Sequence, residues 1–465
     1  MNLAIWLFVF ACIFLLSRYM QKKEIGEKYV SVLIFLSVAM IFIQTSGLIS
    51  SVISMPEADY ENAGYLSADG EYTLSSENNV IVFVVDACSG AYMEQALADQ
   101  PDMLDDFDGF TYYPDCISTY SRTYPSIVYL LSGKRCYYDV PFNEYLISAF
   151  GESTFLSDMK NIGADVRVFT DPIYFDGEAR NQIDNFRTFN GKSLDIIRPY
   201  VLIKQMLHIS GYKCMPYLFK TRFEYNIIIL NHLVRKDPSD IAIEFQDYDF
   251  YTNFEKDGLT LYDNYSDSFR LYHLWGPHGD CFIDENVNLL EDVEPVRALR
   301  GTFKIISAFI NEMKSLKIYD ASTIIILADH GNSYGNSELE IDEEKSCLML
   351  VKPAGQNGAV QVSEAPVSHE NFFSTVLSAY GIDDENFSVP EVYNVSEDST
   401  EPRYYYYDAR FSDGNGVIAS REYRIDGDAR DFSSYSLTGN YWDINFSQDH
   451  LSETRLSEFL AENGK

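Results

Sequence analysis

Three side chains that could bind a metal ion follow two apolar runs of the sequence. Asp86 comes directly after Asn79–Val85, while Asp329 and His330 come directly after Thr323–Ala328. Such β-branched runs are typical of strands that are buried on both faces of a parallel sheet. In open α/β sheets, ligands bind beyond the carboxyl ends of the strands. Carboxylate oxygens and an imidazole nitrogen suit a divalent cation, so the sequence predicts a metal site at this edge.

A hydroxyl nucleophile is predicted within the segment Ser121–Gly133. Pro125 suits the first turn of a helix, and Ile127–Leu131 supply its apolar face. Thr123 would lie just before the helix N-terminus, where backbone amides and the helix dipole favour phosphate or sulfate. Beside a divalent metal, such a hydroxyl can lose its proton and attack phosphorus. The alternative is a simple helix cap, but a predicted metal site in the same chain favours the nucleophile.

The elements that must position these residues alternate between strands and helices. Asp165–Thr170 and Phe269–His278 are two further predicted strands, and the second ends in polar groups. Apolar residues that recur at helical spacing between Val296 and Met313 predict a helix that packs on the sheet. The alternation predicts the α/β class, with a doubly wound and mostly parallel sheet.

The amino-terminal residues 1–53 are predicted to form two transmembrane helices joined by a cytoplasmic loop. Leu3–Leu16 and Tyr29–Ile53 are apolar, and the basic residues between them begin at Arg18 and end at Lys28. No Lys or Arg occurs from Tyr29 through Ser121, so the positive-inside rule predicts a cell-membrane protein with an extracytoplasmic catalytic domain. A cleaved signal peptide is the rival interpretation, but the first segment lacks a basic start and no convincing cleavage site follows the second.

The remaining chain divides by its composition. Residues 54–78 are polar and acidic and are predicted to be a linker. Residues 79–400 would form the catalytic domain, with a helical insertion at about 185–260 that either lies over the active-site face or only covers the sheet. Residues 401–465 contain two strand-like runs around a turn-rich segment and are predicted to form a small antiparallel subdomain.

The composition excludes two classes of site. The formal net charge is −35, which would repel a phosphate backbone, so a nucleic-acid partner is not expected. The seven cysteines have no C-x-x-C spacing, which argues against a zinc site built from cysteines.

The order of these motifs resembles that of the sulfatase/alkaline phosphatase superfamily. The resemblance covers about residues 79–430. Within the superfamily, the motifs are most similar to those of the membrane-anchored phosphoethanolamine transferases and lipoteichoic acid synthases. The segment Ser368–Leu377 especially resembles the phosphoethanolamine transferases. The segments that carry it are Asn79–Asp86, Phe110–Tyr113, Thr123–Gly133, His273–His278 and Ala328–Gly331.

This resemblance implies a role for each matching residue. Thr123 would carry the transferred group as a covalent intermediate, and His278 and His273 would contact the phosphate or protonate the leaving group. Arg122 and His369 are also expected at the substrate, although His369 could instead bind a second metal or cap a helix. The catalytic metal, which could be Mn, Zn, Mg or Ca, would be held by Asp86, Thr123, Asp329 and His330.

Three departures from the family pattern narrow the expected function. Threonine cannot be oxidised to formylglycine, so sulfate-ester hydrolysis is disfavoured. Asp86 stands where the two transferase groups usually have Glu, and Asn332–Ser337 lacks a histidine that many phosphoethanolamine transferases carry. The departures at Asp86 and at Asn332–Ser337 leave undetermined which lipid is the donor and whether a second metal is bound.

The function expected from the resemblance is phosphotransfer. A phosphoethanolamine or phosphoglycerol group would move from a membrane phospholipid donor to a glycan or lipid acceptor of the cell envelope. One alternative is a phosphodiesterase, phosphatase or sulfatase-like hydrolase that uses water as acceptor. Another is an inactive, membrane-tethered binding protein.

Overall fold

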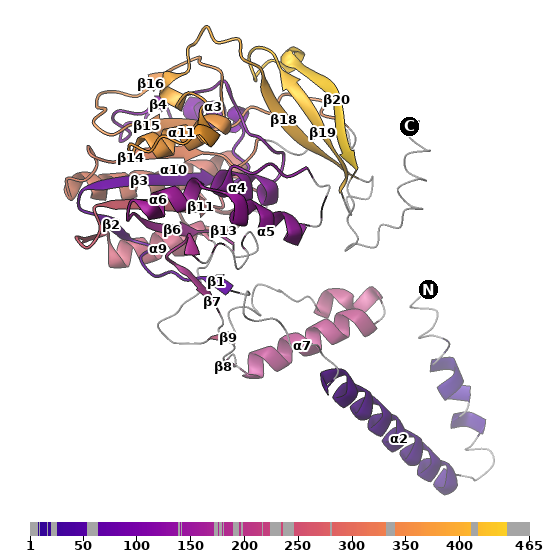
Figure 1. The fold of residues 1–465 in the computed structure, drawn as a ribbon. Helices are drawn as coiled ribbons and strands as arrows, with labels where there is room; N and C mark the ends of the chain where they lie inside the picture. Colours follow the sequence, from indigo (N-terminus) through magenta and orange to yellow (C-terminus); the bar gives the residue numbers. More distant parts are fainter. Residues whose placement is uncertain are drawn as a thin grey trace. The chain divides into compact units, whose positions relative to one another are not determined.

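The chain folds into two compact units in the computed structural model (Figure 1). The first comprises Met1–Glu61 and Phe189–Ser239, and the second comprises Asn62–Thr188 and Asp240–Lys465. The structure describes residues 8, 10–15, 17–19, 26–53, 64–137, 140, 142–171, 175, 179, 181–188, 195–196, 199–215, 217–223, 234–235, 246–279, 281–331, 340–410 and 417–443.

A seven-stranded sheet forms the centre of the second unit, with the strand order β16-β4-β15-β14-β3-β11-β6. The four neighbours β14, β3, β11 and β6 are parallel, while β15 is antiparallel to both of its neighbours. This mixed, mostly parallel α/β sheet agrees with the fold class predicted from the sequence. The strands are β3 (Asn78–Val85), β4 (Thr111–Tyr112), β6 (Asp165–Phe169), β11 (Asp267–Leu274), β14 (Thr323–Leu327), β15 (Met349–Lys352) and β16 (Gln361–Val362).

Helices cover both faces of the sheet, which is why the central strands are continuously apolar (Figure 1). On one face, Phe83 of β3 packs edge-on against Phe309 of α10 (Pro295–Ser315), the helix predicted from apolar spacing. On the other, Phe269 of β11 contacts Phe155 of α6 (Phe155–Asn161). The other helices of this unit are α3 (Gly90–Asp99), α4 (Thr123–Ser132), α5 (Phe142–Glu152), α9 (Asp247–Asp257) and α11 (Glu370–Ser378).

The predicted linker is partly structured, which corrects the expectation for residues 64–78. β1 (Gly64–Leu66) pairs with β7 (Phe186–Thr188), and β2 (Thr73–Ser75) pairs with β10 (Thr260–Tyr262). Both strands are only three residues long, too short to show a hydrophobic period. Residues 54–63 lie outside the described part of the chain.

The predicted insertion is divided between the two units. The first unit contains α7 (Pro199–Cys214), the 3-10 helix η3 (Tyr217–Phe223) and the short strands β8 (Asp195–Ile196) and β9 (Val234–Arg235). In contrast, α9 and β10 belong to the catalytic unit. The expected helical character is therefore met mainly in α7 and α9.

The amino-terminal segment contains α2 (Gly26–Ile53) within the first unit. None of the helices in the described ranges meets the length and apolarity that crossing a membrane requires. The predicted transmembrane hairpin is thus not supported, and part of Leu3–Leu16 lies outside the described residues.

The predicted carboxy-terminal subdomain corresponds to an antiparallel three-stranded sheet. Its strands are β18 (Arg403–Arg410), β19 (Val417–Ile425) and β20 (Tyr435–Asp443). Arg403 forms a buried ion pair of 2.7 Å with Asp115, whose carboxylate also accepts from the Ala429 amide. Residues 444–465 lie outside the described part.

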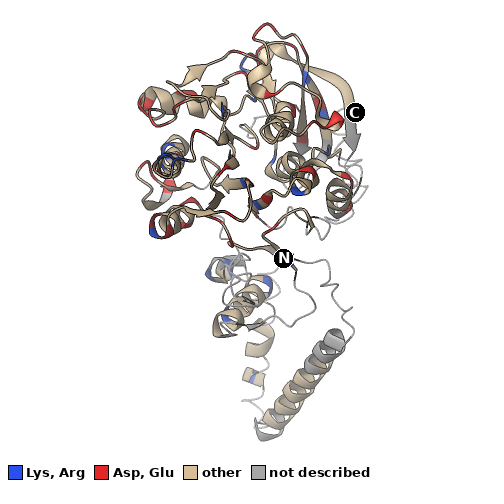
Figure 2. Cartoon of the chain, turned by 60° about the vertical axis from the view of Figure 1, so that its left-hand side comes forward, with Lys and Arg blue, Asp and Glu red and all other residues tan. Residues whose placement is uncertain are grey.

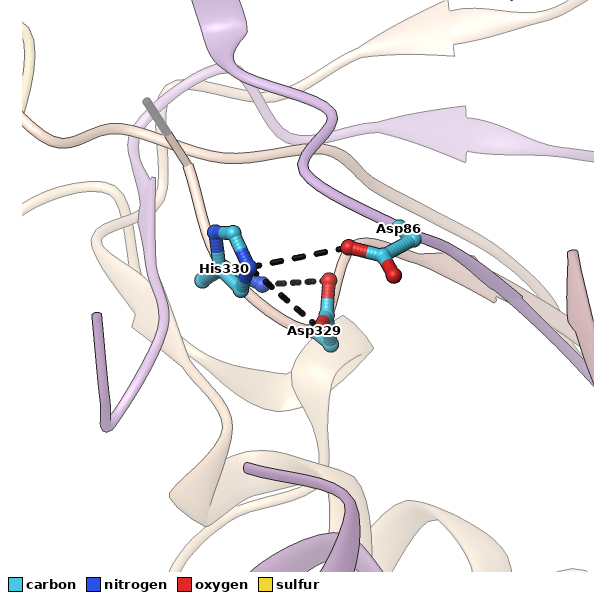
Figure 3. Close-up of side chains that lie close together, drawn as sticks. All are labelled: Asp86, Asp329 and His330. Atoms are coloured by element: carbon cyan, nitrogen blue, oxygen red, sulfur yellow. Dashed lines mark hydrogen bonds and ion pairs between the residues drawn. The ribbon is translucent and has the colours of Figure 1, made fainter. Parts of the chain in front are cut away.

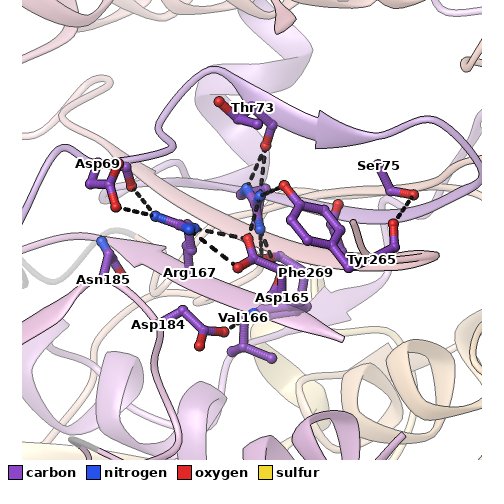
Figure 4. A network of polar contacts seen from close by, with 12 residues as sticks. Asp69, Thr73, Ser75, Asp165, Val166, Arg167, Asp184, Asn185, Tyr265 and Phe269 are labelled. Carbon is purple, nitrogen blue, oxygen red and sulfur yellow. Dashed lines mark hydrogen bonds and ion pairs between the residues drawn. The ribbon is translucent and has the colours of Figure 1, made fainter. Parts of the chain in front are cut away.

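A network of polar contacts joins the amino ends of β6 and β11 to β2, and Figure 4 shows Thr73, Asp165 and Tyr265 within it. The Arg270 side chain is fully buried on β11 and donates to the Thr73 carbonyl oxygen and the Tyr265 hydroxyl. It also forms an ion pair of 2.7 Å with Asp165 of β6, which pairs with Arg167 as well. Burial alone would raise the pKa of Asp165, but the guanidinium groups of Arg167 and Arg270 outweigh it and lower that pKa. The network fixes β2 and β6 against β11, at the end opposite to the predicted site.

We expect Arg270→Met to lower the free energy of unfolding by about 3 kcal/mol, because it leaves buried polar groups with fewer partners. The exposed pair of Arg424 with Asp426 provides a control, and Arg424→Met should lower the free energy of unfolding far less than Arg270→Met does. Denaturant unfolding measures both values, and equal costs would contradict the structural role of the buried network.

Candidate metal centre

The strand register brings two carboxylates to the same level at the carboxyl edge of the sheet. Val84 of β3 pairs with Leu327 of β14. Asp86 and Asp329 each lie two residues beyond this pair, so the two parallel chains present them side by side. Both are buried, with exposed fractions of 4% and 0%.

Asp86, Asp329 and His330 form a group suited to one cation (Figure 3). One ligand atom from each lies within 4.8 Å of the others. His330 Nε2 is 3.6 Å from Asp86 Oδ1 and 3.6 Å from Asp329 Oδ2. The His330 Nδ1 atom lies 2.7 Å from the Gly331 carbonyl oxygen, which assigns the proton to Nδ1 and directs the Nε2 lone pair at the carboxylates.

The electrostatics of these carboxylates favour a bound cation. Burial, reinforced by the Asp329 carboxylate, raises the pKa of Asp86 to about 8. For Asp329, burial is outweighed by His330, His273 and the Ala87 amide, which together lower its pKa. Asp329 Oδ1 accepts from the Ala87 and His330 amides, while the buried Oδ2 has no hydrogen-bond partner among the described residues. The donor set therefore fits a divalent metal.

Thr123 lies at this group from the side of α4. Its Oγ1 is 3.4 Å from Asp86 Oδ1 and 3.3 Å from His330 Nε2. The helix begins at Thr123 itself, and the capping position belongs to Arg122, whose backbone is extended. The threonine hydroxyl is thus directed at the predicted metal ligands, which disfavours the interpretation of Thr123 as a simple cap.

Of the two histidines in the His273–His278 segment, His273 lies at the second carboxylate oxygen of Asp86. His273 Nε2 is 3.6 Å from Asp86 Oδ2, and its Nδ1 is 2.8 Å from the Thr170 hydroxyl. Burial lowers the pKa of His273 to about 4, so this ring is neutral at physiological pH. His278 is only partly buried, and its electrostatic interaction with Asp86 opposes the effect of burial on the pKa of that carboxyl.

Asp247 is a site-supporting residue that the sequence analysis missed. It begins α9 and is buried, and its carboxylate accepts from the amides of Trp275 (2.6 Å) and Gly276 (3.1 Å) and from the Thr302 hydroxyl (2.8 Å). These bonds fix the turn that leads from β11 to His278. Asp247 begins an acidic stretch, Asp247-Tyr-Asp249, so its sequence carries no signal that separates it from surface acids.

The structure places His369 differently from the expected substrate contact. Its Nδ1 accepts from the Thr119 amide at 3.3 Å, and its Nε2 lies 2.9 Å from the Ala328 carbonyl oxygen. Both ring nitrogens are therefore bonded to backbone, so His369 positions the strand end before Asp329 rather than offering a ligand atom. Arg122 is partly buried beside Thr123. The segment Asn332–Ser337 lies outside the described residues.

Comparison of sequences finds no matching family model and no matching curated protein. Solved structures do match. A phosphonate monoester hydrolase from Silicibacter pomeroyi is 14% identical over 83% of this chain and 95% of its own, with a TM-score of 0.44. An alkaline phosphatase superfamily protein from Vibrio parahaemolyticus is 10% identical over 81% and 84%, with a TM-score of 0.42.

A third similar structure is the C-terminal periplasmic domain of the phosphoethanolamine transferase EptC from Campylobacter jejuni. It is 14% identical and covers 67% of this chain and 92% of its own, with a TM-score of 0.37. These three proteins are similar to the chain, and at these identities and TM-scores the likeness carries no argument about its reaction.

We expect the metal-free protein to lose stability between pH 6.5 and about 8. The pKa of Asp86 is raised to about 8, so in this window the folded protein keeps a proton that the unfolded chain has lost. Burial lowers the pKa values of His273 and His369 to about 4. Below pH 6.5 the unfolded chain therefore binds protons that the folded protein does not, and these two residues make stability rise with pH. In a chelator, the melting temperature of the wild type should fall with pH relative to that of Asp86→Asn.

Added Mn or Zn should remove this fall in the wild type, because the cation stabilises the ionised carboxylate. Parallel pH profiles for the wild type and Asp86→Asn in the chelator would contradict the assigned role of Asp86.

Asp247→Ala should lower kcat/KM for an aryl phosphodiester by roughly 10-fold or more, because a supporting residue of a metal site has effects of this size. Metal content should be unchanged, since Asp247 touches none of the three ligand residues. Asp257→Asn, at the exposed carboxyl end of the same helix, is the matched control and should leave kcat/KM unchanged. A loss of metal in Asp247→Ala would assign Asp247 to metal binding rather than to positioning.

Proposed function

We propose that this chain is a metal-dependent phosphotransferase that uses Thr123 as its nucleophile. The observation that carries the proposal is the position of Thr123 Oγ1, within 3.4 Å of both Asp86 and His330 at the first residue of α4. A structural threonine needs no neighbours of this kind. A nucleophilic threonine needs ligands that favour its ionised form and a positive field for the phosphate that it attacks.

The parts of the chain would divide the reaction between them. A divalent ion held by Asp86, Asp329 and His330 would favour ionisation of the Thr123 hydroxyl and offset the charge of the phosphoryl group. The backbone amides of the first turn of α4 would bind the non-bridging phosphate oxygens. Thr123 Oγ1 would form a bond to phosphorus as the bond from phosphorus to the leaving alcohol breaks.

Proton balance in this step assigns a role to His278. The hydroxyl proton of Thr123 would pass to solvent, and His278 would supply a proton to the leaving alcohol. His273 is buried and its pKa is lowered, so it suits positioning of Asp86 better than proton donation. In the second half of the reaction an acceptor hydroxyl would give its proton to His278 and form a bond to the same phosphorus, as the bond from phosphorus to Thr123 Oγ1 breaks.

The identity of the transferred group is a second part of the proposal. We propose a phosphoethanolamine or phosphoglycerol group, taken from a membrane phospholipid and given to a cell-envelope glycan or lipid outside the cytoplasm. The motif resemblance supports this proposal. A hydrolase would use the same residues with water as acceptor, so the acceptor is what an experiment must identify.

The full-length protein, with Mn or Zn and vesicles that contain phosphatidylethanolamine and phosphatidylglycerol, should gain mass on the peptide that carries Thr123. The size of the increment identifies the group. Thr123→Ala should gain none, whereas Thr123→Ser retains a hydroxyl and should gain the same increment more slowly.

The label should then appear in an envelope glycan or lipid acceptor when that acceptor is added. Release of free head group alone would establish the hydrolase instead. No increment in a protein that demonstrably contains metal, together with no turnover of any phosphodiester, would contradict the proposed function.

A further inference from the structure

The helix α7 (Pro199–Cys214) exposes several large apolar side chains. Tyr200, Ile203 and Leu207 follow one another at helical spacing, and they are 80%, 57% and 63% exposed. Met206 beside them is 58% exposed. None of the described side chains of α7 is buried. An isolated helix of 16 residues is marginal in water, so this stripe calls for a surface to cover it.

The short helix η3 covers only the second half of α7. The Phe223 ring lies against Gly211, where a β-carbon would approach the ring to 2.1 Å, and Lys220 lies 4.9 Å over the Tyr212 ring. The contacts of η3 therefore begin near His208 and leave the stripe of Tyr200, Ile203 and Leu207 open. Phe219 of η3 adds a further apolar side chain that is 48% exposed.

The charge of this segment is opposite to that of the chain. Pro199–Phe223 contains no Asp or Glu, within a chain whose net charge is −35 (Figure 2). Around the helix axis, Lys204 lies about 60° to one side of Leu207 and Lys213 about 120° to the other. The cations of the segment are Lys204, Lys213, Lys220 and Arg222.

We propose that α7 and η3 dock on an anionic lipid surface, with the apolar stripe inserted at the interface. An apolar stripe flanked by lysines is the pattern of helices that lie in the membrane plane, because lysine stems stay in the apolar zone while the ammonium groups reach the head groups. The acidity of the rest of the chain would be repelled by anionic lipid, so this locally basic segment determines which side faces the surface.

A second copy of the chain is the less favoured occupant. Two copies, each with a net charge of −35, repel one another, whereas a lipid bilayer offers apolar depth beneath its negative charge. The inference uses only the α7–η3 segment and does not rest on the proposed reaction.

Hydrogen–deuterium exchange of the full-length protein tests this docking locally. Vesicles of phosphatidylcholine mixed with phosphatidylserine should slow exchange of the amides in Pro199–Phe223, and phosphatidylcholine alone should slow it much less. Phosphatidylserine is chosen because its head group is not one proposed for transfer. Exchange is measured separately for each peptide, so protection of another apolar segment such as α2 does not change the exchange measured for Pro199–Phe223.

Neutralising two lysines supplies the charge test. Lys204→Gln combined with Lys213→Gln should weaken the protection by roughly 30-fold in lipid concentration, because each cation near an anionic surface contributes about 5-fold. The control pair Lys256→Gln and Lys317→Gln makes the same change in net charge on exposed residues of the other unit, and should leave the protection unchanged.

Three outcomes would overturn the inference. One is the absence of protection by anionic vesicles, and another is equal protection by the two kinds of vesicle. The third is protection that rises with protein concentration without vesicles, which would identify a second copy as the occupant. Phosphotransfer that persists in the lysine variants with a soluble diester would leave the proposed reaction intact whichever outcome is found.

Discussion

The structure depends on the repulsion between two buried carboxylates, Asp86 and Asp329, that the sheet register holds at one level. This arrangement raises the pKa of Asp86 and leaves Oδ2 of Asp329 without a hydrogen bond from any described residue. Residues around the pair reduce this cost: the Ala87 amide, the oriented ring of His330 and the neutral ring of His273. A divalent ion would neutralise the two carboxylates, and the Thr123 hydroxyl lies within 3.4 Å of Asp86 and His330.

Rigid contacts on both sides keep this pair in place. At the opposite end of the strands, Arg270 joins β11 to β6 and β2. Near the site, His369 bonds the end of β14 to the segment before α4, and Asp247 holds the turn before His278. The candidate ligands therefore come from strand ends, and the proposed nucleophile comes from a helix start, so strands and a helix fix their positions.

Strands with continuous apolar runs, and the residues directly after them, could be predicted from sequence because burial on both faces leaves an unmistakable composition. The position of Thr123 at a helix start followed from Pro125. Sequence could not predict β1 and β2, whose three residues carry no period, nor the role of Asp247, whose partners are backbone amides far along the chain. His369 was expected at the substrate, with a second metal or a helix cap as alternatives, whereas its bonds to Thr119 and Ala328 depend on tertiary packing.

The most direct test of this account is an X-ray structure of the protein with Mn or Zn, recorded at the absorption edge of the metal. The account predicts one anomalous peak at about 2.0–2.3 Å from oxygens of Asp86 and Asp329 and from Nε2 of His330, with the Thr123 hydroxyl as a further neighbour. A peak bound by other residues, or no peak at saturating metal with the site intact, would contradict it.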